Sequence, residues 1–237
     1  MPGMLHAIVF DFDGVLVDSE GVHFAAIRDE AAALGVTLDE PLYHRVFIGY
    51  DDRDAFRAVL SMKAGGPPDP DALETIDPRE LAGLCERKQA RFEAMIGSGV
   101  EPLPGVRELL DEAAAALPIA VASGATRRDI EAILTGLGWL DRFEAIVTAD
   151  DVARSKPHPE TYALAVERLA ARHGRAVEPG GCLAIEDTAP GLRSAIDAGL
   201  RTLGVCTTGT AEALAKADRV EASLAGVTLR DLEGWFG

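Results

Sequence analysis

The sequence predicts an α/β protein with a doubly wound parallel sheet and an inserted domain made only of helices. Two observations carry this prediction. From about residue 102 onward, short apolar runs alternate with amphipathic stretches at the spacing of βαβ units. Between residues 20 and 98 this alternation stops, and the patterns are helical only. We therefore expect a core of residues 1–18 and 102–237 and a helical cap of residues 19–101.

Five apolar runs are expected to form the strands of the core. The first, residues 4–12, is continuously apolar and β-branched at its centre, which is typical of a strand buried on both faces of a parallel sheet. The others are residues 117–123, 144–150, 182–187 and 201–206. The amphipathic stretches between them predict helices at residues 105–117, 127–138, 158–172 and 189–199.

The inserted block is expected to contain three helices, over residues 21–34, 42–61 and 78–96. Asp77-Pro78 marks the start of the last one, because a capping residue is followed by proline at the first helical position. Residues 64–71 (AGGPPDPD) predict a loop. Pro102 and Pro104 indicate a hinge where the chain returns to the core.

Composition excludes several classes of protein. The 237 residues carry a net charge of −16, and no run of Lys or Arg forms the basic patch of a nucleic-acid-binding protein. No apolar run approaches the ~20 residues of a membrane span, and residues 5–10 are too short for a signal peptide. We expect a cytoplasmic protein with no nucleic-acid or membrane partner. Three cysteines without a CxxC motif predict reduced thiols rather than disulfides or a zinc site.

Charged and polar residues follow the predicted strands, where the ligand crevice of an open parallel sheet lies. Asp11 and Asp13 end the first run and, being two apart, point to the same side. Ser123-Gly124 ends the second run, before a helix start whose N–H groups favour an anion. Glu186-Asp187 ends the fourth. Lys156, one of only four lysines, precedes a predicted helix. These residues are expected to converge on one site.

Carboxylates gathered in this way need a cation among them, and hard oxygen ligands suit Mg²⁺. A carboxylate beside Mg²⁺ and a lysine can attack phosphorus and form an aspartyl phosphate. A second carboxyl group two residues on can protonate the leaving oxygen and then deprotonate the attacking water. The pattern therefore indicates phosphoryl chemistry.

Other interpretations of the same residues exist. Asp11-x-Asp13-Gly14 also fits the start of a calcium loop, but an EF-hand loop has its glycine at the sixth position and a helix before it. Ser123 also fits a simple helix cap, and Lys156 a solvated surface lysine. Glu186 fits either a direct metal ligand or a residue that supports the ligands.

DFDGVLVDSE (residues 11–20), Ser123-Gly124, Lys156-Pro157 and Glu186-Asp187 resemble, in order and spacing, the four motifs of the haloacid dehalogenase superfamily. The resemblance extends over nearly the whole chain. It implies a Rossmann-like core with a helical cap inserted after the first motif. It also implies Asp11 as the nucleophile and Asp13 as the acid and base. Further, it implies that Ser123 and Lys156 bind the transferring phosphoryl group and that the metal is held by Asp11, the backbone carbonyl of Asp13, Glu186 and Asp187.

The acid at position 13 separates subgroups of that superfamily. The true dehalogenases and the phosphonoacetaldehyde hydrolases lack an acid there, whereas this chain has Asp13. The resemblance thus favours hydrolysis of a phosphoric monoester over cleavage of a carbon–halogen or carbon–phosphorus bond. A non-catalytic binding protein on the same fold is disfavoured, because the nucleophile and the acid are both present.

In the cap, three residues are candidates for substrate binding, beside Gly124 of the core. Lys88 falls within the apolar stripe of residues 78–96, so its ammonium either reaches the substrate or extends along the helix edge to solvent. His23 lies on an apolar face near the hinge and is either a substrate contact or a partly buried histidine. Arg53 is either a substrate contact or an ion-pair partner of a neighbouring aspartate.

His23, Arg53 and Lys88 are similar to the cap residues of the subgroup that contains β-phosphoglucomutase and small sugar-phosphate phosphatases. Two departures favour a phosphatase for a sugar phosphate or a phosphoglycolate-like acid. The spacing from Gly49 to Arg53 is one residue longer than in the mutase, and Ser-Gly-Ala replaces Ser-Ala-Ser in the second motif. An isomerase that moves a phosphoryl group on a hexose phosphate is the alternative. A monomer is expected by default, and a homodimer stays open.

Overall fold

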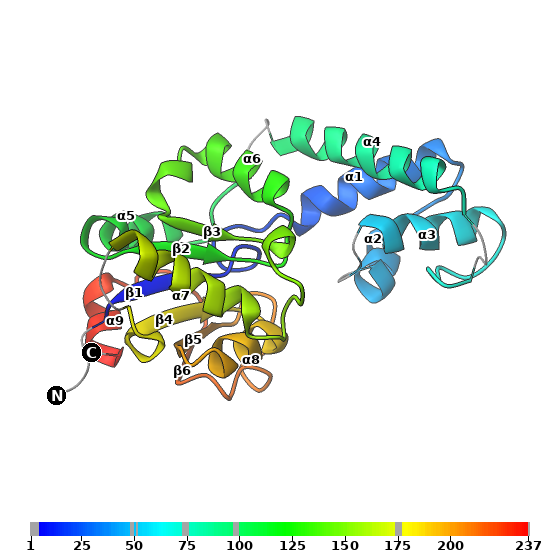
Figure 1. The fold of residues 1–237 in the computed structure, drawn as a ribbon. Coiled ribbons are helices and arrows are strands. Elements are labelled where there is room, and N and C mark those ends of the chain that lie inside the picture. Colours follow the sequence, from blue (N-terminus) through cyan, green and yellow to red (C-terminus); the bar gives the residue numbers. More distant parts are fainter. Residues whose placement is uncertain are drawn as a thin grey trace. The chain divides into compact units, whose positions relative to one another are not determined.

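The computed structural model describes residues 5–47, 50, 52–72, 76–96, 100–173 and 177–236. The chain divides into two compact units (Figure 1), one of Met1–Asp18 with Val100–Gly237 and the other of Ser19–Gly99. We call them the core and the cap. The core carries a parallel sheet and the described part of the cap is helical, which confirms the predicted fold class.

The sheet of the core has six described strands, in the order β3-β2-β1-β4-β5-β6, and every neighbouring pair is parallel. Every residue of β1, β2 and β4 is buried, as expected for continuously apolar strands with helices on both faces. The strand order reverses between β1 and β4, and open α/β sheets bind ligands outside the carboxyl ends at such a point. The strands are β1 (Ala7–Phe10), β2 (Ile119–Ala122), β3 (Ala145–Val147), β4 (Cys182–Glu186), β5 (Arg201–Val205) and β6 (Arg219–Glu221).

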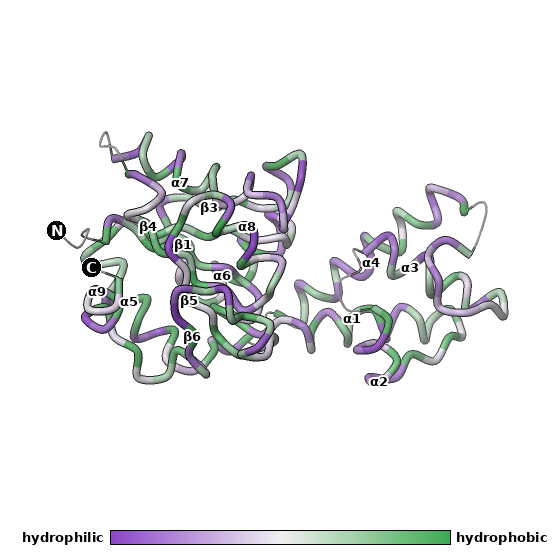
Figure 2. Tube along the Cα trace, turned by 90° about the horizontal axis from the view of Figure 1, so that it is seen from below, coloured by the Kyte–Doolittle hydropathy of each residue, from purple (hydrophilic) through white to green (hydrophobic). Residues whose placement is uncertain are grey.

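Helices cover both faces of the sheet. α7 (Glu160–His173) and α8 (Ala189–Asp197) contact each other and pack on the strands from one side. α5 (Val106–Ala116) and α9 (Leu229–Phe236) contact each other and lie on the opposite side from α7 (Figure 2). The remaining helix of the core is α6 (Arg127–Leu137), and single 3₁₀ turns occur at Leu140–Arg142, Ala149–Asp151 and Pro179–Gly181.

Two helices of the core begin directly after strand ends because threonines cap them. Thr126 accepts a hydrogen bond from the backbone N–H of Asp129 at the start of α6. Thr188 does the same for Gly191 at the start of α8. A cap of this kind satisfies a backbone donor that the helix itself leaves without a partner. The first turns of α6 and α8 therefore lie close to the carboxyl ends of β2 and β4.

The cap has its own apolar interior, in which helices α1, α3 and α4 pack together. Phe47, Phe56 and Leu84 are among its fully buried side chains. Asp77 accepts a hydrogen bond of 2.8 Å from the N–H of Arg79, which confirms the predicted helix start at Pro78. The elements are α1 (Glu20–Ala33), α2 (Glu40–Leu42), a π-helical turn (Tyr43–Phe47), α3 (Asp52–Lys63) and α4 (Pro78–Ile96).

Two parts of the structure differ from the sequence-based expectation. The helix expected over residues 42–61 is not continuous: Asp39 caps a start at Glu40, the chain widens into a π-turn, and a separate helix begins at Asp52. The strand β6 and the helix α9 were not expected. β6 is only three residues long and partly exposed, so it lacks the apolar run that marks the other strands.

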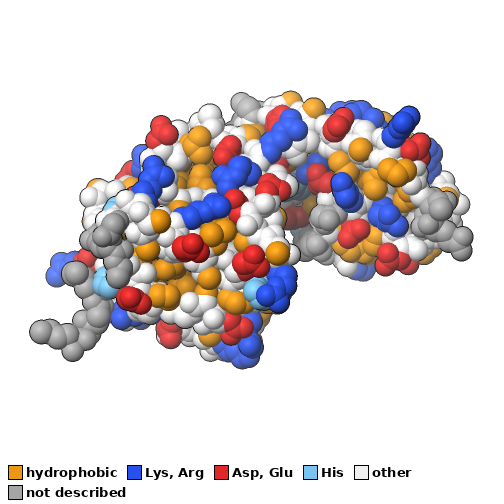
Figure 3. Space-filling model, viewed as in Figure 1, with side chains coloured by type: hydrophobic (Ala, Val, Ile, Leu, Met, Phe, Trp, Pro, Cys, Tyr) orange, Lys and Arg blue, Asp and Glu red, His pale blue; other side chains and the backbone are white. Residues whose placement is uncertain are grey.

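The visible surface carries charges of both signs. On the face shown in Figure 3, Lys and Arg side chains are interspersed with Asp and Glu. Among the described residues, no helix combines the length and the apolar character needed to cross a bilayer.

Candidate active site

Four charged side chains meet at the carboxyl ends of β1 and β4. Asp11 follows β1, and its N–H donates a hydrogen bond of 2.9 Å to the carbonyl oxygen of Ile185 on β4. Glu186 ends β4, and Asp187 follows it. Lys156 comes from the loop before α7, and its Nζ lies 2.8 Å from Asp11 Oδ1 and 2.6 Å from Glu186 Oε1. One ammonium group thus bridges carboxylates from the two strands between which the sheet order reverses.

Glu186 is fully buried, and both oxygens of its carboxylate accept several hydrogen bonds. Oε1 accepts from the Lys156 ammonium at 2.6 Å and from the Tyr162 hydroxyl at 3.0 Å. Oε2 accepts from the backbone N–H groups of Asp187 and Thr188, both at 3.1 Å, and from the Thr188 hydroxyl at 3.0 Å. Buried charge requires such partners. This carboxylate is therefore held in one position.

Two glycines allow the backbone to approach these acids. A Cβ on Gly191, in the first turn of α8, would lie 1.8 Å from Glu186 Oε1. A Cβ on Gly14 would lie 1.9 Å from Asp187 Oδ2, and its φ of 77° is in the left-handed region that favours glycine. The loop after β1 and the start of α8 thus close on the acidic cluster only because both positions lack a side chain.

The proximity of these groups changes their pKa values. Burial, and then the charge of Glu186, raise the pKa of Asp11 well above its ordinary value, although Lys156 opposes the change. Burial also raises the pKa of Asp187 to about 6, against a hydrogen bond from Thr208. Burial alone would lower the pKa of Lys156, but Asp11 and Glu186 outweigh it, and its pKa is raised. The ammonium therefore stays charged, whereas the two aspartates lose their protons at a higher pH than a free aspartate does.

The acidic cluster fits a divalent cation. One carboxylate oxygen from each of Asp11, Glu186 and Asp187 lies within 4.8 Å of the other two. Within the described part of the chain, Asp187 Oδ1 is buried without a hydrogen-bond partner, whereas both oxygens of Glu186 are occupied by donors. Hard carboxylate oxygens are the ligands that Mg²⁺ prefers. Asp187 therefore offers a ligand atom that nothing else in the described protein uses.

The other predicted core residues lie in the loops beside this cluster. Asp13 is half-buried in the turn after β1, in a segment that pairs with Val17. Ser123 follows β2 and is buried, and its Oγ accepts a hydrogen bond of 3.0 Å from the N–H of Ala125. Gly124 is exposed, and a Cβ there would meet no atom within 4 Å. The backbone at Gly124 therefore borders open space.

The structure brings two of the three predicted cap residues together. The Lys88 ammonium contacts His23 Nδ1 at 2.9 Å, and the His23 ring stacks on Phe92 with centroids 4.2 Å apart. Lys88 is fully buried, which contradicts the alternative in which its ammonium extends to solvent. Its ammonium is 2.8 Å from Asp52 Oδ1, a partner that sequence reasoning missed. Arg53 is exposed on α3.

Burial and then the charge of Lys88 lower the pKa of His23 to about 3, so its imidazole is neutral at physiological pH. Gly49, from which the spacing to Arg53 was counted, lies outside the described residues.

Sequence reasoning also missed residues of the core that support the site. Tyr162 contacts both Glu186 and Lys156, and Thr188 donates to Glu186 while it caps α8. Tyr162 lies on the apolar face of α7, where an aromatic residue indicates packing rather than a polar contact. The feature of the sequence that could have placed it near the site is its position six residues after Lys156.

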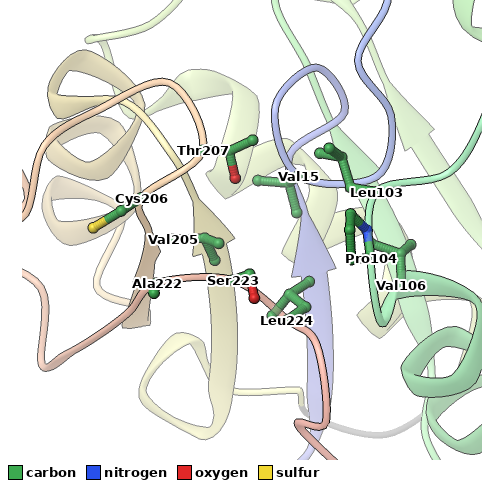
Figure 4. Close-up of a pocket in the computed structure, with 10 residues that line it drawn as sticks. All are labelled: Val15, Leu103, Pro104, Val106, Val205, Cys206, Thr207, Ala222, Ser223 and Leu224. Carbon is green, nitrogen blue, oxygen red and sulfur yellow. The ribbon is translucent and has the colours of Figure 1, made fainter.

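A cavity of about 240 Å³ lies elsewhere in the core (Figure 4). Apolar side chains line most of it, among them Val15, Leu103 and Val205, and the sulfur of Cys206 points away from its centre. None of the predicted site residues lines this cavity. The acidic cluster, rather than this cavity, is therefore the candidate active site.

Comparison with known proteins supports that choice. The family model described as haloacid dehalogenase-like hydrolase matches residues 5–199. Protein CbbY (plasmid) of Cupriavidus necator is 33% identical over 225 residues, which cover 88% of this chain and 81% of that protein. Validoxylamine A 7'-phosphate phosphatase of Streptomyces hygroscopicus subsp. limoneus is 31% identical, over 91% of this chain and 92% of that protein.

A solved structure gives the same result. The crystal structure of CbbY from Rhodobacter sphaeroides in complex with phosphate superposes with a TM-score of 0.78 at 29% identity, over 97% of this chain and 100% of that one. The fold and the acidic cluster thus define a hydrolase. The chain belongs to the haloacid dehalogenase-like hydrolases, and the prediction of a phosphatase of that superfamily is confirmed.

Proposed function

We propose that this chain is a Mg²⁺-dependent phosphatase that hydrolyses a small phosphorylated metabolite, a sugar phosphate or a phosphoglycolate-like acid, through an aspartyl phosphate on Asp11. The observation that carries the proposal is the Lys156 ammonium shared by Asp11 and Glu186 at the reversal of strand order. The names of the relatives, which include a phosphatase of a phosphorylated metabolite, support the substrate class.

Asp11 acts as the nucleophile. One of its carboxylate oxygens attacks phosphorus, and the bond to the leaving oxygen breaks, so the phosphoryl group moves to Asp11. The lysine contact supports this role, because Lys156 Nζ is 2.8 Å from Asp11 Oδ1 and carries a charge opposite to that of the phosphoryl oxygens. A cation fixed in advance stabilises the transferring group without reorganisation.

Asp13 acts as the acid and then as the base. Its carboxyl group donates a proton to the leaving oxygen, and its carboxylate later takes a proton from the water that attacks the aspartyl phosphate. Ser123 and Gly124 hold the transferring phosphoryl group. The Ser123 Oγ accepts from Ala125, so its own proton is available to donate, and Gly124 leaves space beside it.

The metal would be held by Asp11, Asp187 and the backbone carbonyl of Asp13. When bound, Mg²⁺ supplies charge that offsets the negative charge of the phosphoryl group. We assign Glu186 to the support of Lys156 rather than to direct ligation, because both its oxygens already accept hydrogen bonds from protein donors. His23, Arg53 and Lys88 remain our candidates for the choice of substrate, together with Asp52.

The test is ³¹P NMR of the protein with Mg²⁺ and a panel of phosphorylated metabolites. Growth of free phosphate from some of them is expected, and Asp11→Asn should abolish it. Asp141→Asn, which alters an exposed carboxylate of the core, is the matched control and should keep the activity. Full phosphate release by Asp11→Asn would refute the nucleophile.

The same experiment tests the alternative activity. The panel includes β-glucose 1-phosphate with a trace of bisphosphate. A growing sugar 6-phosphate resonance with little free phosphate would identify a mutase, and Lys88 would then be the next residue to replace.

A further inference from the structure

We propose that Tyr162 is a positioning residue of the active site, which acts through Glu186 to keep the Lys156 ammonium on Asp11. The inference rests on the proposed function, in which Asp11 and Lys156 handle the phosphoryl group. It concerns a residue for which neither the motifs nor the proposed chemistry has assigned a task.

The Tyr162 side chain contacts both partners of the central ion pair. Its hydroxyl donates to Glu186 Oε1 at 3.0 Å, and the Lys156 Nζ lies 5.0 Å from the centroid of its ring. Its side chain is fully buried on α7. A tyrosine hydroxyl that is removed from water needs a hydrogen-bond partner, and here that partner is a catalytic-site carboxylate.

Asp11 and Glu186 compete for the ammonium group of Lys156, and Tyr162 affects this competition. Lys156 Nζ is shared between Asp11 Oδ1 at 2.8 Å and Glu186 Oε1 at 2.6 Å. The Tyr162 hydroxyl occupies the same Oε1 and offsets part of its negative charge. Without that donor, Oε1 becomes a stronger acceptor in a site of low dielectric, and the ammonium moves toward Glu186 and away from Asp11.

The local framework suits a fixed position for Tyr162. Glu160, at the start of α7, accepts hydrogen bonds from the N–H groups of Ala153 and Arg154 in the loop that carries Lys156. Ser194 on α8 donates a hydrogen bond of 2.6 Å to the carbonyl oxygen of His158 in the same loop. The loop with Lys156 and the helix with Tyr162 are therefore tied together, and the long lysine side chain is the part that still needs alignment.

Tyr162 positions other groups and takes no part in the chemical step. Tyr162 has no exposed surface, and its hydroxyl points to Glu186. Replacing it with phenylalanine removes the hydroxyl and keeps the ring against Lys156. Thr202→Val is the matched control, because Thr202 is a buried residue near the start of β5 whose hydroxyl also donates to a carboxylate, that of Asp218.

The kinetic test combines Tyr162→Phe with Glu186→Gln. Tyr162→Phe should lower kcat for phosphate release about tenfold and change KM less than twofold. A tenfold loss in rate is the effect expected when one hydrogen bond to a charged group is removed. In the Glu186→Gln background the same change should cost less than twofold, because the ionic competition is gone. Equal losses in both backgrounds, or a loss matched by Thr202→Val, would overturn the proposal.

A second measurement does not depend on activity. The chain has only four lysines, of which Lys63 and Lys216 are exposed, so slowly exchanging ¹⁵N-labelled ammonium signals should come from Lys88 and Lys156. Loss of one signal in Lys156→Arg assigns it. Tyr162→Phe should shift the Lys156 signal and leave that of Lys88, in the cap, unchanged.

An unchanged Lys156 signal in Tyr162→Phe would overturn the proposal, whatever the rates. If the parent protein hydrolysed no phosphate ester at all, the proposed function would fail. The ammonium signals would still decide whether Tyr162 positions Lys156.

Discussion

Replacement of Gly191 by alanine is expected to displace the Glu186 carboxylate. The new Cβ would lie 1.8 Å from Oε1, 2.1 Å from Cδ and 2.3 Å from Oε2, whereas ordinary contact begins at 3.4 Å. Neither the backbone at Gly191 nor the Glu186 side chain can move away easily. The N–H of Gly191 is bound to the Thr188 hydroxyl, and Glu186 is fully buried among its donors.

The magnitude follows from the bonds that must break. A hydrogen bond to a charged group contributes about 1.5–3 kcal/mol, so the loss of two of them costs about 3–6 kcal/mol. Alanine is favoured over glycine in a helix by about 1 kcal/mol, which offsets a small part. We expect the free energy of unfolding to fall by about 2–5 kcal/mol, or about 2–4 °C in Tm for each kcal/mol. A displaced partner of Lys156 should also slow phosphate release about 100-fold, or about 2.7 kcal/mol in the barrier.

Calorimetry and a phosphate-release assay measure the two effects on the same samples. Gly234→Ala is the matched control, because Gly234 lies exposed in α9 and a Cβ there meets nothing within 4 Å. That control should be more stable than the parent by about 0.5–1 kcal/mol, with an unchanged rate. If Gly191→Ala were as stable and as active as Gly234→Ala, the Glu186 carboxylate would not lie against the start of α8.

Three further predictions concern charge. Burial lowers the pKa of His23 to about 3, so its imidazole should stay neutral between pH 5 and 8. NMR of the folded protein should show no shift of its ring resonances in that range, and a titration near pH 6.5 would contradict the neutral state. Lys88→Met should lower the free energy of unfolding of the cap by about 2 kcal/mol, which is less than for a fully buried ion pair because the partner Asp52 is partly exposed. The control Lys63→Met replaces an exposed lysine of α3 and should change the free energy of unfolding by less than about 0.5 kcal/mol. The raised pKa of Asp187, about 6, means that the folded state binds this proton more tightly than the unfolded state. Without a divalent cation the core should lose stability as pH rises from about 4 to 6. Saturating Mg²⁺ should therefore raise Tm more at pH 7 than at pH 5, and an equal rise at both would refute the role of Asp187.

The core was predictable because its strands are continuous apolar runs and its helices keep a helical period. Residues 7–10, for example, are apolar without a break, and β1 lies at the centre of the sheet with helices on both faces. The division of residues 40–63 was not predictable in the same way. The π-turn of residues 43–47 keeps an apolar pattern close to that of an α-helix, so periodicity does not distinguish the two.

The acidic site was predictable as far as the backbone brings its residues together. Asp11 and Glu186 end neighbouring parallel strands, so their meeting follows from strand order. Contacts that depend on side-chain direction were not predictable. Asp52 reaches Lys88 from a different helix, and Tyr162 reaches Glu186 from a helix face that otherwise packs on the sheet. Neither contact leaves a periodic signal in the sequence.

The charge of the site gives a physical reason for its unusual packing. Asp11, Glu186 and Asp187 gather around one ammonium, so the carboxylates outnumber their cation by three to one. Such a cluster opposes folding, because burial removes the ionised acids from water and their charges also repel one another. The raised pKa values of Asp11 and Asp187 reflect burial first and the charge of Glu186 after it. The backbone nevertheless lacks Cβ atoms at the two places where they would push the acids apart. A chain optimised for stability alone would fill these positions or replace the acids. A divalent cation held among these three acids would offset their repulsion, and the spacing of their oxygens fits such an ion.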